Sequence, residues 1–271
     1  MKSVQGLMDL TGRMVAITGG AGHIGRAMAS AVAELGASVA IVDQDLAASE
    51  AVAVGLWEEF GGSSGSSFGG FQTDLADEVA VRALPGEIAA RMGGLDVLVN
   101  AAAFVGTSDL EGWAVPFESQ SVDTWRKAME VNLTSVFSLT QAATPFLKAS
   151  GRGSIINVSS IYGVYGPDMR LYGDTGMGNP AAYAASKAGL IQFTRWCATV
   201  LAPDVRANAI TPGGVLRGQD SGFVERYERK TPLGRMATEE DFKGAVTYLA
   251  SDLSAYVTGQ NLIVDGGFGV W

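Results

Sequence analysis

A phenol and an ammonium stand four residues apart in this chain. Tyr183 and Lys187 fall within residues 180–201, where Gly189 is the only glycine or proline away from the ends, and this stretch predicts a helix. Since positions i and i+4 share one face of a helix, the two side chains would lie side by side. The cation would lower the pKa of the phenol and let it exchange protons nearer neutral pH. The alternative is a solvated surface pair, and the rest of the chain must decide between the two.

Short apolar segments alternate with longer helical segments around this pair. The apolar segments are rich in Val and Ile and do not alternate with polar residues, which is typical of parallel strands covered on both faces. Right-handed crossovers between such strands predict a doubly wound, Rossmann-like α/β sheet of seven strands in a single domain, residues 1–271. We predict strands at residues 14–18, 38–43, 71–73, 96–99, 154–158, 205–210 and 261–264, and helices at 22–35, 46–60, 77–92, 122–149, 180–201 and 239–250.

Two details of this prediction concern its less regular segments. The helix at 122–149 allows for breaks near Thr134 and Pro145, and the segment 61–70 (GGSSGSSFGG) has the composition of a flexible surface loop within a βα unit.

Composition excludes several classes of protein. The net charge is −9 and there is no long basic run, so a nucleic-acid partner is not expected. The single cysteine, Cys197, cannot form an internal disulfide and is interpreted as a core residue, and one histidine with one cysteine cannot supply a metal site. No segment has the character of a membrane span or of a signal peptide, which predicts a cytoplasmic protein.

A glycine-rich turn joins the first strand to the first helix. In residues 18–25 (TGGAGHIG), Gly19 would allow the sharp turn, Gly22 would clear space near phosphates, and Gly25 would let helix and sheet approach. The helix N-terminus would offer N–H groups and a positive dipole end to a pyrophosphate. Asp43 ends the second strand 18 residues beyond Gly25 and could accept both ribose hydroxyls while repelling a 2′-phosphate. No Lys or Arg follows it closely, so NAD is predicted over NADP.

Three further residues extend this nucleotide end. His23 is the only histidine and lies in the turn, where a packing or phosphate-side role is expected rather than catalysis. Asp74 and Leu75 follow the third strand and could meet an adenine ring, and the alternative for Asp74 is a turn or helix cap.

With these features in place, the chain resembles the short-chain dehydrogenase/reductase family over nearly its whole length. The matching features are the glycine turn, Asp43, Asp74, Asn100-Ala101-Ala102-Ala103, Asn132, Ser159-Ser160, Tyr183 with Lys187, Pro212-Gly213 and Val264-Asp265-Gly266-Gly267. The cofactor-binding residues that the turn and the resemblance imply are Gly19, Gly22, His23, Ile24, Gly25, Asp43, Asp74, Leu75, Asn100, Ala101, Ala102, Tyr183, Lys187, Pro212 and Gly213.

The resemblance also implies catalytic roles. Tyr183 would be the general acid/base on the substrate oxygen, and Lys187 would bind the nicotinamide ribose and lower the pKa of Tyr183. Ser160 would bind the substrate oxygen, with Ser159 as the alternative. Asn132 would hold a water in a proton relay behind Lys187, with a helix-kink amide as the alternative. Hydride transfer to a carbonyl requires such a proton source and such donors.

The chain departs from the family pattern in three places. The turn lacks the usual glycine at position 23, and its spacing is similar to that of sugar-nucleotide epimerases and dehydratases. Asn100-Ala101-Ala102-Ala103 stands where Asn-Asn-Ala-Gly is usual. The segments 103–132 and 161–180 are longer than usual, and we expect substrate loops at about 104–120, 161–180 and 214–232, with a mobile lid at 218–229.

The insert at 161–180 bears on the substrate. It leaves the fifth strand at the carboxyl edge, where open α/β sheets bind ligands. Its polar and aromatic residues suit a hydroxylated, sugar-like substrate, and it resembles dehydrogenases of surface-sugar and flagellin-glycan pathways. The alternative is a packing or oligomer-contact loop. The side chains in question are Tyr162, Tyr165, Asp168, Arg170, Tyr172, Asp174 and Asn179.

The sequence therefore predicts an NAD-dependent oxidoreductase that interconverts a secondary alcohol and a ketone. One rival is an epimerase or dehydratase that retains its NAD, which the glycine spacing favours. Another is an NAD-sensing binding module, which the complete set of catalytic residues argues against. The resemblance implies a homo-oligomer, tetramer or dimer. The apolar ending, residues 268–271, suits either such an interface or packing on its own chain.

Overall fold

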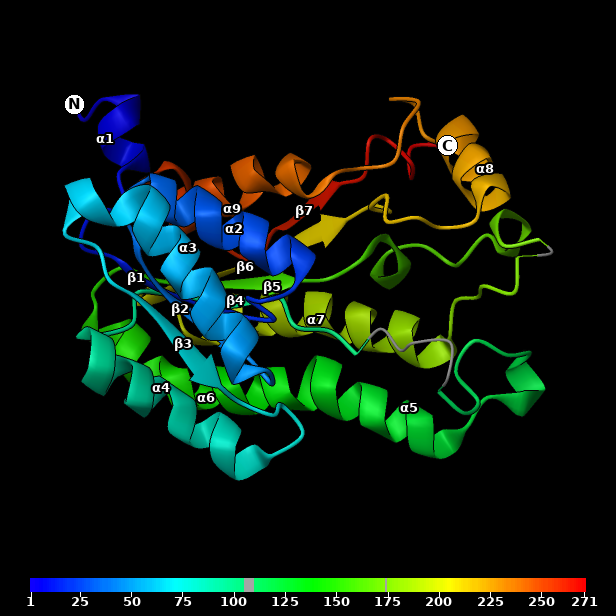
Figure 1. Ribbon diagram of the computed structural model, residues 1–271, viewed down its shortest axis with the longest axis horizontal. Coiled ribbons are helices and arrows are strands. Elements are labelled where there is room, and N and C mark those ends of the chain that lie inside the picture. The colour runs from blue at the N-terminus through cyan, green and yellow to red at the C-terminus, as the bar shows by residue number, and fades with distance from the viewer. Residues whose placement is uncertain (105–109, 174) are drawn as a thin grey trace.

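The fold is built on one parallel sheet of seven strands. The computed structural model describes residues 1–104, 110–173 and 175–271, so Asp174 and part of the 104–120 loop lie outside the described residues. The strand order is β3-β2-β1-β4-β5-β6-β7, which confirms the doubly wound sheet (Figure 1). The strands are β1 (Met14–Thr18), β2 (Ser38–Asp43), β3 (Phe68–Gln72), β4 (Val97–Asn100), β5 (Gly153–Val158), β6 (Val205–Pro212) and β7 (Asn261–Val264).

Helices cover both faces of the sheet, and this explains the uniformly apolar strands. Successive strand residues point to opposite faces, so Val15 packs against one helical layer and Met14 against the other. Cys197 lies in the second layer's core at 1% exposure, as expected. One layer contains α2 (His23–Glu34), α3 (Leu46–Ser64) and α9 (Lys243–Ala250), and the other contains α4 (Glu78–Met92), α6 (Ser135–Ala149) and α7 (Ala181–Val200).

Four segments differ from their prediction. The 61–70 loop was wrong, because α3 continues to Ser64, a left-handed Gly65 (φ 67°) ends it, and β3 starts at Phe68 in pairing with β2. A short helix α1 (Val4–Met8) was not predicted. The helix at 122–149 has the predicted break near Thr134, as a π-helical turn at Glu130–Thr134 after α5 (Val122–Met129), but the predicted break near Pro145 was wrong, because Pro145 lies inside an unbroken α6. The expected lid contains a regular helix, α8 (Ser221–Lys230).

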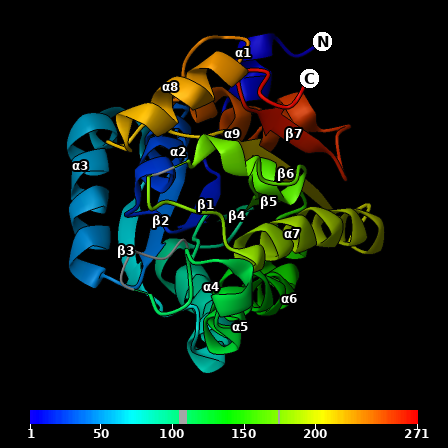
Figure 2. The same cartoon turned by 90° about the vertical axis from the view of Figure 1, so that its right-hand side faces the viewer.

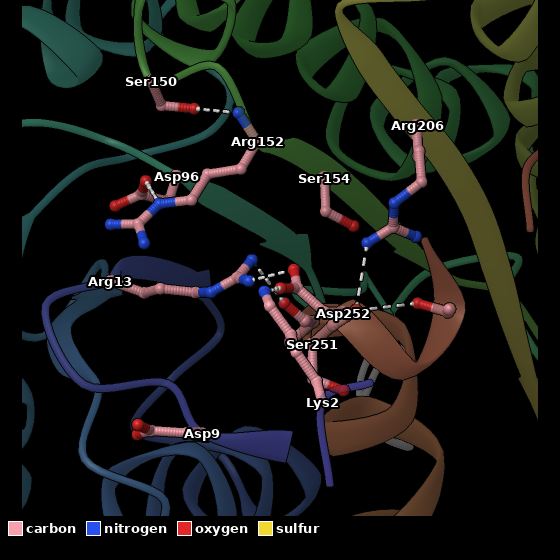
Figure 3. A network of polar contacts seen from close by, with 12 residues as sticks. Lys2, Asp9, Arg13, Asp96, Ser150, Arg152, Ser154, Arg206, Ser251 and Asp252 are labelled. Carbon is pink, nitrogen blue, oxygen red and sulfur yellow. Dashed lines mark hydrogen bonds and ion pairs between the residues drawn. The ribbon is translucent and has the colours of Figure 1, made fainter. Parts of the chain in front are cut away.

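A polar network holds the amino ends of the strands (Figure 3). Asp96 accepts hydrogen bonds from the Met14 backbone N–H and from Arg152 Nε, each at 2.7 Å. Arg13, only 4% exposed, donates to the Ala250 carbonyl at 3.3 Å and pairs with Asp252. The carboxyl ends of the strands lie at the opposite edge, which faces the viewer in Figure 2, and open α/β sheets bind ligands at that edge.

None of the helices in the described ranges combines the length and the hydrophobicity that crossing a membrane requires.

Candidate active site

A cavity of about 700 Å³ opens at the carboxyl ends of the strands. Its walls come from the turn after β1, the ends of β2 and β4, the segment after β5, the start of α7 and the segment after β6. It brings together most of the predicted site residues, although they are spread from position 19 to position 213. The predicted members of the lining are Gly19, Gly22, His23, Ile24, Gly25, Asp43, Asp74, Leu75, Ala101, Ala102, Ser160, Tyr183, Lys187, Pro212 and Gly213.

The glycine turn is shaped by close backbone approaches. Gly19 has φ +65°, and a Cβ there would lie 2.7 Å from the Cα of Ala102 at the end of β4. A Cβ on Gly25 would lie 2.1 Å from the Gly19 carbonyl oxygen, so Gly25 lets α2 approach the turn itself. Helix α2 begins after Gly22, which has no side chain to cap it, and its first N–H groups are therefore available to an anion. The turn fits a pyrophosphate.

Asp43 stands beside this turn at the end of β2. Its Oδ1 accepts a hydrogen bond from the Gln44 N–H at 2.9 Å, and its Oδ2 accepts one from the Ala21 N–H at 3.3 Å. The partly exposed carboxylate keeps lone pairs directed at the cavity, as a ribose diol requires. Asp74 accepts from the Ala76 N–H at 2.9 Å and also lines the cavity, so the turn and the adenine-side interpretations are compatible.

His23 is the first residue of α2 and is exposed. Its Nδ1 lies 3.9 Å from Glu239, which also pairs with Arg217 at 3.1 Å. His23 thus lies on the exposed side of the phosphate end of the cavity, and its non-catalytic role stays a prediction.

The two serines after β5 have different partners. Ser159 donates to the Lys187 carbonyl at 2.7 Å and so ties β5 to α7. Ser160 accepts from the Tyr162 N–H at 3.2 Å and shares a side-chain hydrogen bond with Tyr183. Ser160 and Tyr183 therefore face the same point of the cavity, while Ser159 serves the backbone.

Tyr183 and Lys187 do lie side by side, but the expected lowering of the tyrosine pKa was wrong for this structure. Burial raises the pKa of Tyr183, and the hydrogen bond with Ser160 only partly opposes it. Lys187 is 2% exposed, donates from Nζ to the Val158 carbonyl at 2.8 Å, and stands 5.9 Å from the Tyr183 ring centroid. Burial lowers the pKa of Lys187 to about 8. Desolvation of the phenolate outweighs both the Ser160 hydrogen bond and the attraction of Arg217.

Two predicted residues lie outside the lining. Asn100 donates from Nδ2 to Asn157 Oδ1 at 2.8 Å and connects β4 to β5. Asn132 is fully buried in the π-helical turn, where its amide accepts from the Phe104 N–H at 2.5 Å and donates to Phe104 O and to Ser186 Oγ. Both amide hydrogens of Asn132 are thereby used in holding the loop after β4 against α7. The helix-kink interpretation agrees with this geometry, and the relay role stays a prediction.

Part of the 161–180 insert lines the cavity, as a substrate loop would, and part of it packs against the rest of the chain. Tyr162, Tyr172 and Asn179 line the cavity. Asp168 instead pairs with Arg170 and with Lys230 of α8, at 2.8 and 3.1 Å.

Helix α8 and the C-terminus hold the insert in place. Arg226 of α8 donates to the Leu171 carbonyl at 2.8 Å. Phe268 stacks on Tyr227 of α8 at 4.7 Å and is 4% exposed, so this part of the C-terminus packs on its own chain.

The sequence predicted substrate loops at 104–120 and 214–232 but did not single out the side chains that line the cavity from these segments and just beyond them. Tyr227 accepts from the Gly214 N–H at 2.5 Å, and both border the cavity. The apolar face of α8 was visible in the sequence, but it carried no sign that it faced a ligand. The lining side chains that were not singled out include Trp113, Phe223, Tyr227 and Met236.

Known proteins share this architecture. A family model described as Enoyl-(Acyl carrier protein) reductase matches residues 19–269. A relative from Rhizobium meliloti (strain 1021), the probable galactose dehydrogenase GalD, is 37% identical over 266 residues, covering 96% of each chain. A D-threitol dehydrogenase from Mycolicibacterium smegmatis is 33% identical, covering 96% of this chain and 94% of the relative.

Solved structures also match this chain over nearly its whole length. The NADPH-dependent 3-quinuclidinone reductase from Rhodotorula rubra matches with a TM-score of 0.87 at 29% identity, covering 100% of this chain and 96% of that one. A short-chain dehydrogenase from Leptospira borgpetersenii with bound NAD⁺ matches with a TM-score of 0.82 at 33% identity, covering 99% and 96%. The near-complete matches in sequence and in structure show that this chain belongs to the short-chain dehydrogenase/reductase family of NAD(P)-dependent oxidoreductases.

Proposed function

We propose that the protein is an NAD-dependent dehydrogenase that interconverts a secondary alcohol and a ketone on a polar, hydroxylated substrate. The observation that carries this proposal is the pairing of Tyr183 with Ser160 beside the buried Lys187, in one cavity with the uncapped start of α2. Relatives named as galactose and D-threitol dehydrogenases support a hydroxylated substrate.

The nucleotide end supports NAD as the cofactor. The Asp43 carboxylate would accept the two hydroxyls of the adenosine ribose, and its charge would repel the phosphate of NADP. Gly19, Gly22 and the first turn of α2 would hold the pyrophosphate, and Asp74 with Leu75 would border the adenine. Lys187 would donate to the nicotinamide ribose, since its Nζ has one hydrogen-bond acceptor among the described residues.

The substrate end supports proton transfer through Tyr183. A nicotinamide bound here would supply or accept the hydride. Ser160 and Tyr183 would hold the substrate oxygen from two sides, and during alcohol oxidation Tyr183 would take its proton. Lys187 would stabilise the phenolate that this requires, because its ammonium is buried nearby and little screened. Asn132 would act by positioning the loop after β4, and a relay through it remains part of the proposal.

The experiment combines a substrate screen with one matched pair of variants. NAD⁺ and NADP⁺ reduction is followed over polyols, aldonates, amino sugars and cyclic alcohols, and reduction of NAD⁺ is expected to dominate. Tyr183→Phe should lower kcat by roughly a hundredfold or more while NADH binding persists. Tyr256→Phe is the control, because that tyrosine is fully exposed. Unchanged turnover in Tyr183→Phe would disprove the proposed mechanism.

We also propose a homo-oligomer, tetramer or dimer. Exposed aromatic side chains gather on the outer faces of α6 and α7, where Phe137 is 44% and Trp196 is 53% exposed and Phe193 lies against both. Apolar surface of this kind is typical of a protein interface. Light scattering from the purified protein measures the mass directly.

A further inference from the structure

The insert carries a row of polar groups along one wall of the cavity. Tyr172 donates from its hydroxyl to the hydroxyl of Tyr162 at 2.7 Å. A side-chain hydrogen bond also joins Asn179 to the Tyr172 hydroxyl. All three residues line the cavity that contains Tyr183. The row therefore runs from one end of the insert to the other and faces the substrate space.

The two ends of this row have unused hydrogen-bonding capacity. Asn179 Oδ1 is buried and has no hydrogen-bond partner among the described residues. Tyr162 accepts the hydrogen bond from Tyr172, so its own hydroxyl proton remains free for an acceptor. Burial raises the pKa of Tyr162, which keeps it a donor over the ordinary pH range. A buried acceptor left without a donor is costly, so a ligand that completes it is favoured.

The row is held firmly by apolar packing. Tyr172 is 5% exposed and contacts the ring of Phe223 on α8, with centroids 5.4 Å apart. Leu171 is 4% exposed, and its carbonyl receives the hydrogen bond from Arg226. Polar groups fixed in this way can select a ligand without first being ordered by it.

We propose that Tyr162 and Asn179 together bind a second hydroxyl group of the substrate, apart from the one that Tyr183 deprotonates. This inference rests on the proposed dehydrogenase function. The Tyr162 hydroxyl donates to the substrate oxygen, and that hydroxyl's proton is donated to Asn179 Oδ1. A hydroxyl can do both at once, whereas a carboxylate has no proton for Asn179 and an ammonium has no lone pair for Tyr162. The substrate class is thus a polyol or sugar with at least two free hydroxyls.

The first test compares the best polyol of the NAD⁺ reduction screen with its analogues that each lack one hydroxyl. Loss of one particular remote hydroxyl should lower kcat/KM by about tenfold to a hundredfold, because the polar pair is then left incomplete. Tyr162→Phe and Asn179→Ala should each lower kcat/KM for the full polyol by a similar factor and change that of the deoxy analogue by less than about twofold. Tyr165→Phe is the matched control, a tyrosine of the same insert outside the cavity lining.

A binding measurement decides the inference without turnover. In the presence of NADH, members of the polyol panel should raise the Tm of the wild-type protein. Each variant should need at least a fivefold higher polyol concentration for the same rise in Tm. The inference is overturned if the best ligand has a single hydroxyl, if no polyol protects, or if each variant affects full and deoxy ligands equally. Binding that follows the prediction, with no alcohol oxidised, would count against the proposed dehydrogenase function alone.

Discussion

Substitution of Gly19 by alanine should destabilise the fold through two separable effects. The residue has φ +65°, which costs a non-glycine residue about 1–2 kcal/mol. The new Cβ would lie 2.7 and 2.8 Å from backbone atoms of Ala102, and such overpacking costs about 1–3 kcal/mol. The lower entropy of the unfolded alanine chain returns roughly 0.4–1 kcal/mol. The net loss is about 3 kcal/mol, which in a chain of this size lowers Tm by roughly 6–12 °C.

Two other glycines separate these effects. Gly12 has φ +72°, and a Cβ there would meet no atom of the described residues within 4 Å, so Gly12→Ala should cost only about 1 kcal/mol. Gly25 has ordinary φ, but its Cβ would lie 2.1 Å from the Gly19 oxygen, so Gly25→Ala reports the clash without the cost of a left-handed backbone.

Urea unfolding gives the free energies, and NADH fluorescence gives the affinity. Gly19→Ala and Gly25→Ala should bind NADH at least tenfold more weakly, since both distort the start of α2, whereas Gly12→Ala should bind normally. Equal urea midpoints for Gly19→Ala and Gly12→Ala would refute the reasoning from close contact.

Two further predictions concern buried charge. Because burial lowers the pKa of Lys187 from 10.5 to about 8, the unfolded state binds more protons between these values. The unfolding free energy of the wild type relative to Lys187→Met should therefore rise from pH 8 to pH 10.5, by roughly 3 kcal/mol at most, and stay flat below pH 8; parallel pH profiles would contradict it. Asp96→Ala leaves the buried Met14 N–H without its acceptor and the Arg152 side chain with only the Gly12 carbonyl among the described residues, and it should cost about 2–4 kcal/mol in urea unfolding. Glu78→Ala removes an exposed pair with Arg82 and should cost less than about 0.5 kcal/mol, so similar losses in both variants would disprove the anchoring role of Asp96.

Much of the nucleotide end could be predicted from the sequence, because its signals are local. The turn at 18–25 needs glycine where the backbone is left-handed or crowded, and Asp43 needs only to end a strand beside it. Parallel strands bring their carboxyl ends to one edge, so residues far apart in the chain arrive at one cavity once the strands are recognised. The spacing of Tyr183 and Lys187 likewise needs only a helix.

The features that local spacing did not reveal depend on distant partners. The serine-rich stretch after residue 60 reads as a loop, but pairing with β2 makes part of it a strand. The partners that hold the Asn132 amide, Phe104 and Ser186, are 28 and 54 residues away in the chain. Such contacts arise only when segments that are remote in sequence pack together.

By itself, therefore, the sequence determined the sheet, the glycine turn and the Tyr183–Lys187 pair, because each follows from local backbone conformation and periodicity. The tertiary structure decided the direction of the Tyr183 pKa, because desolvation depends on every atom that covers the hydroxyl. It also decided that Ser160, and not Ser159, faces Tyr183, and that the insert presents Tyr162 and Asn179 to the cavity. The side chains that meet across a cavity come from segments far apart in the chain, so tertiary packing decides these contacts and local residue spacing does not reveal them.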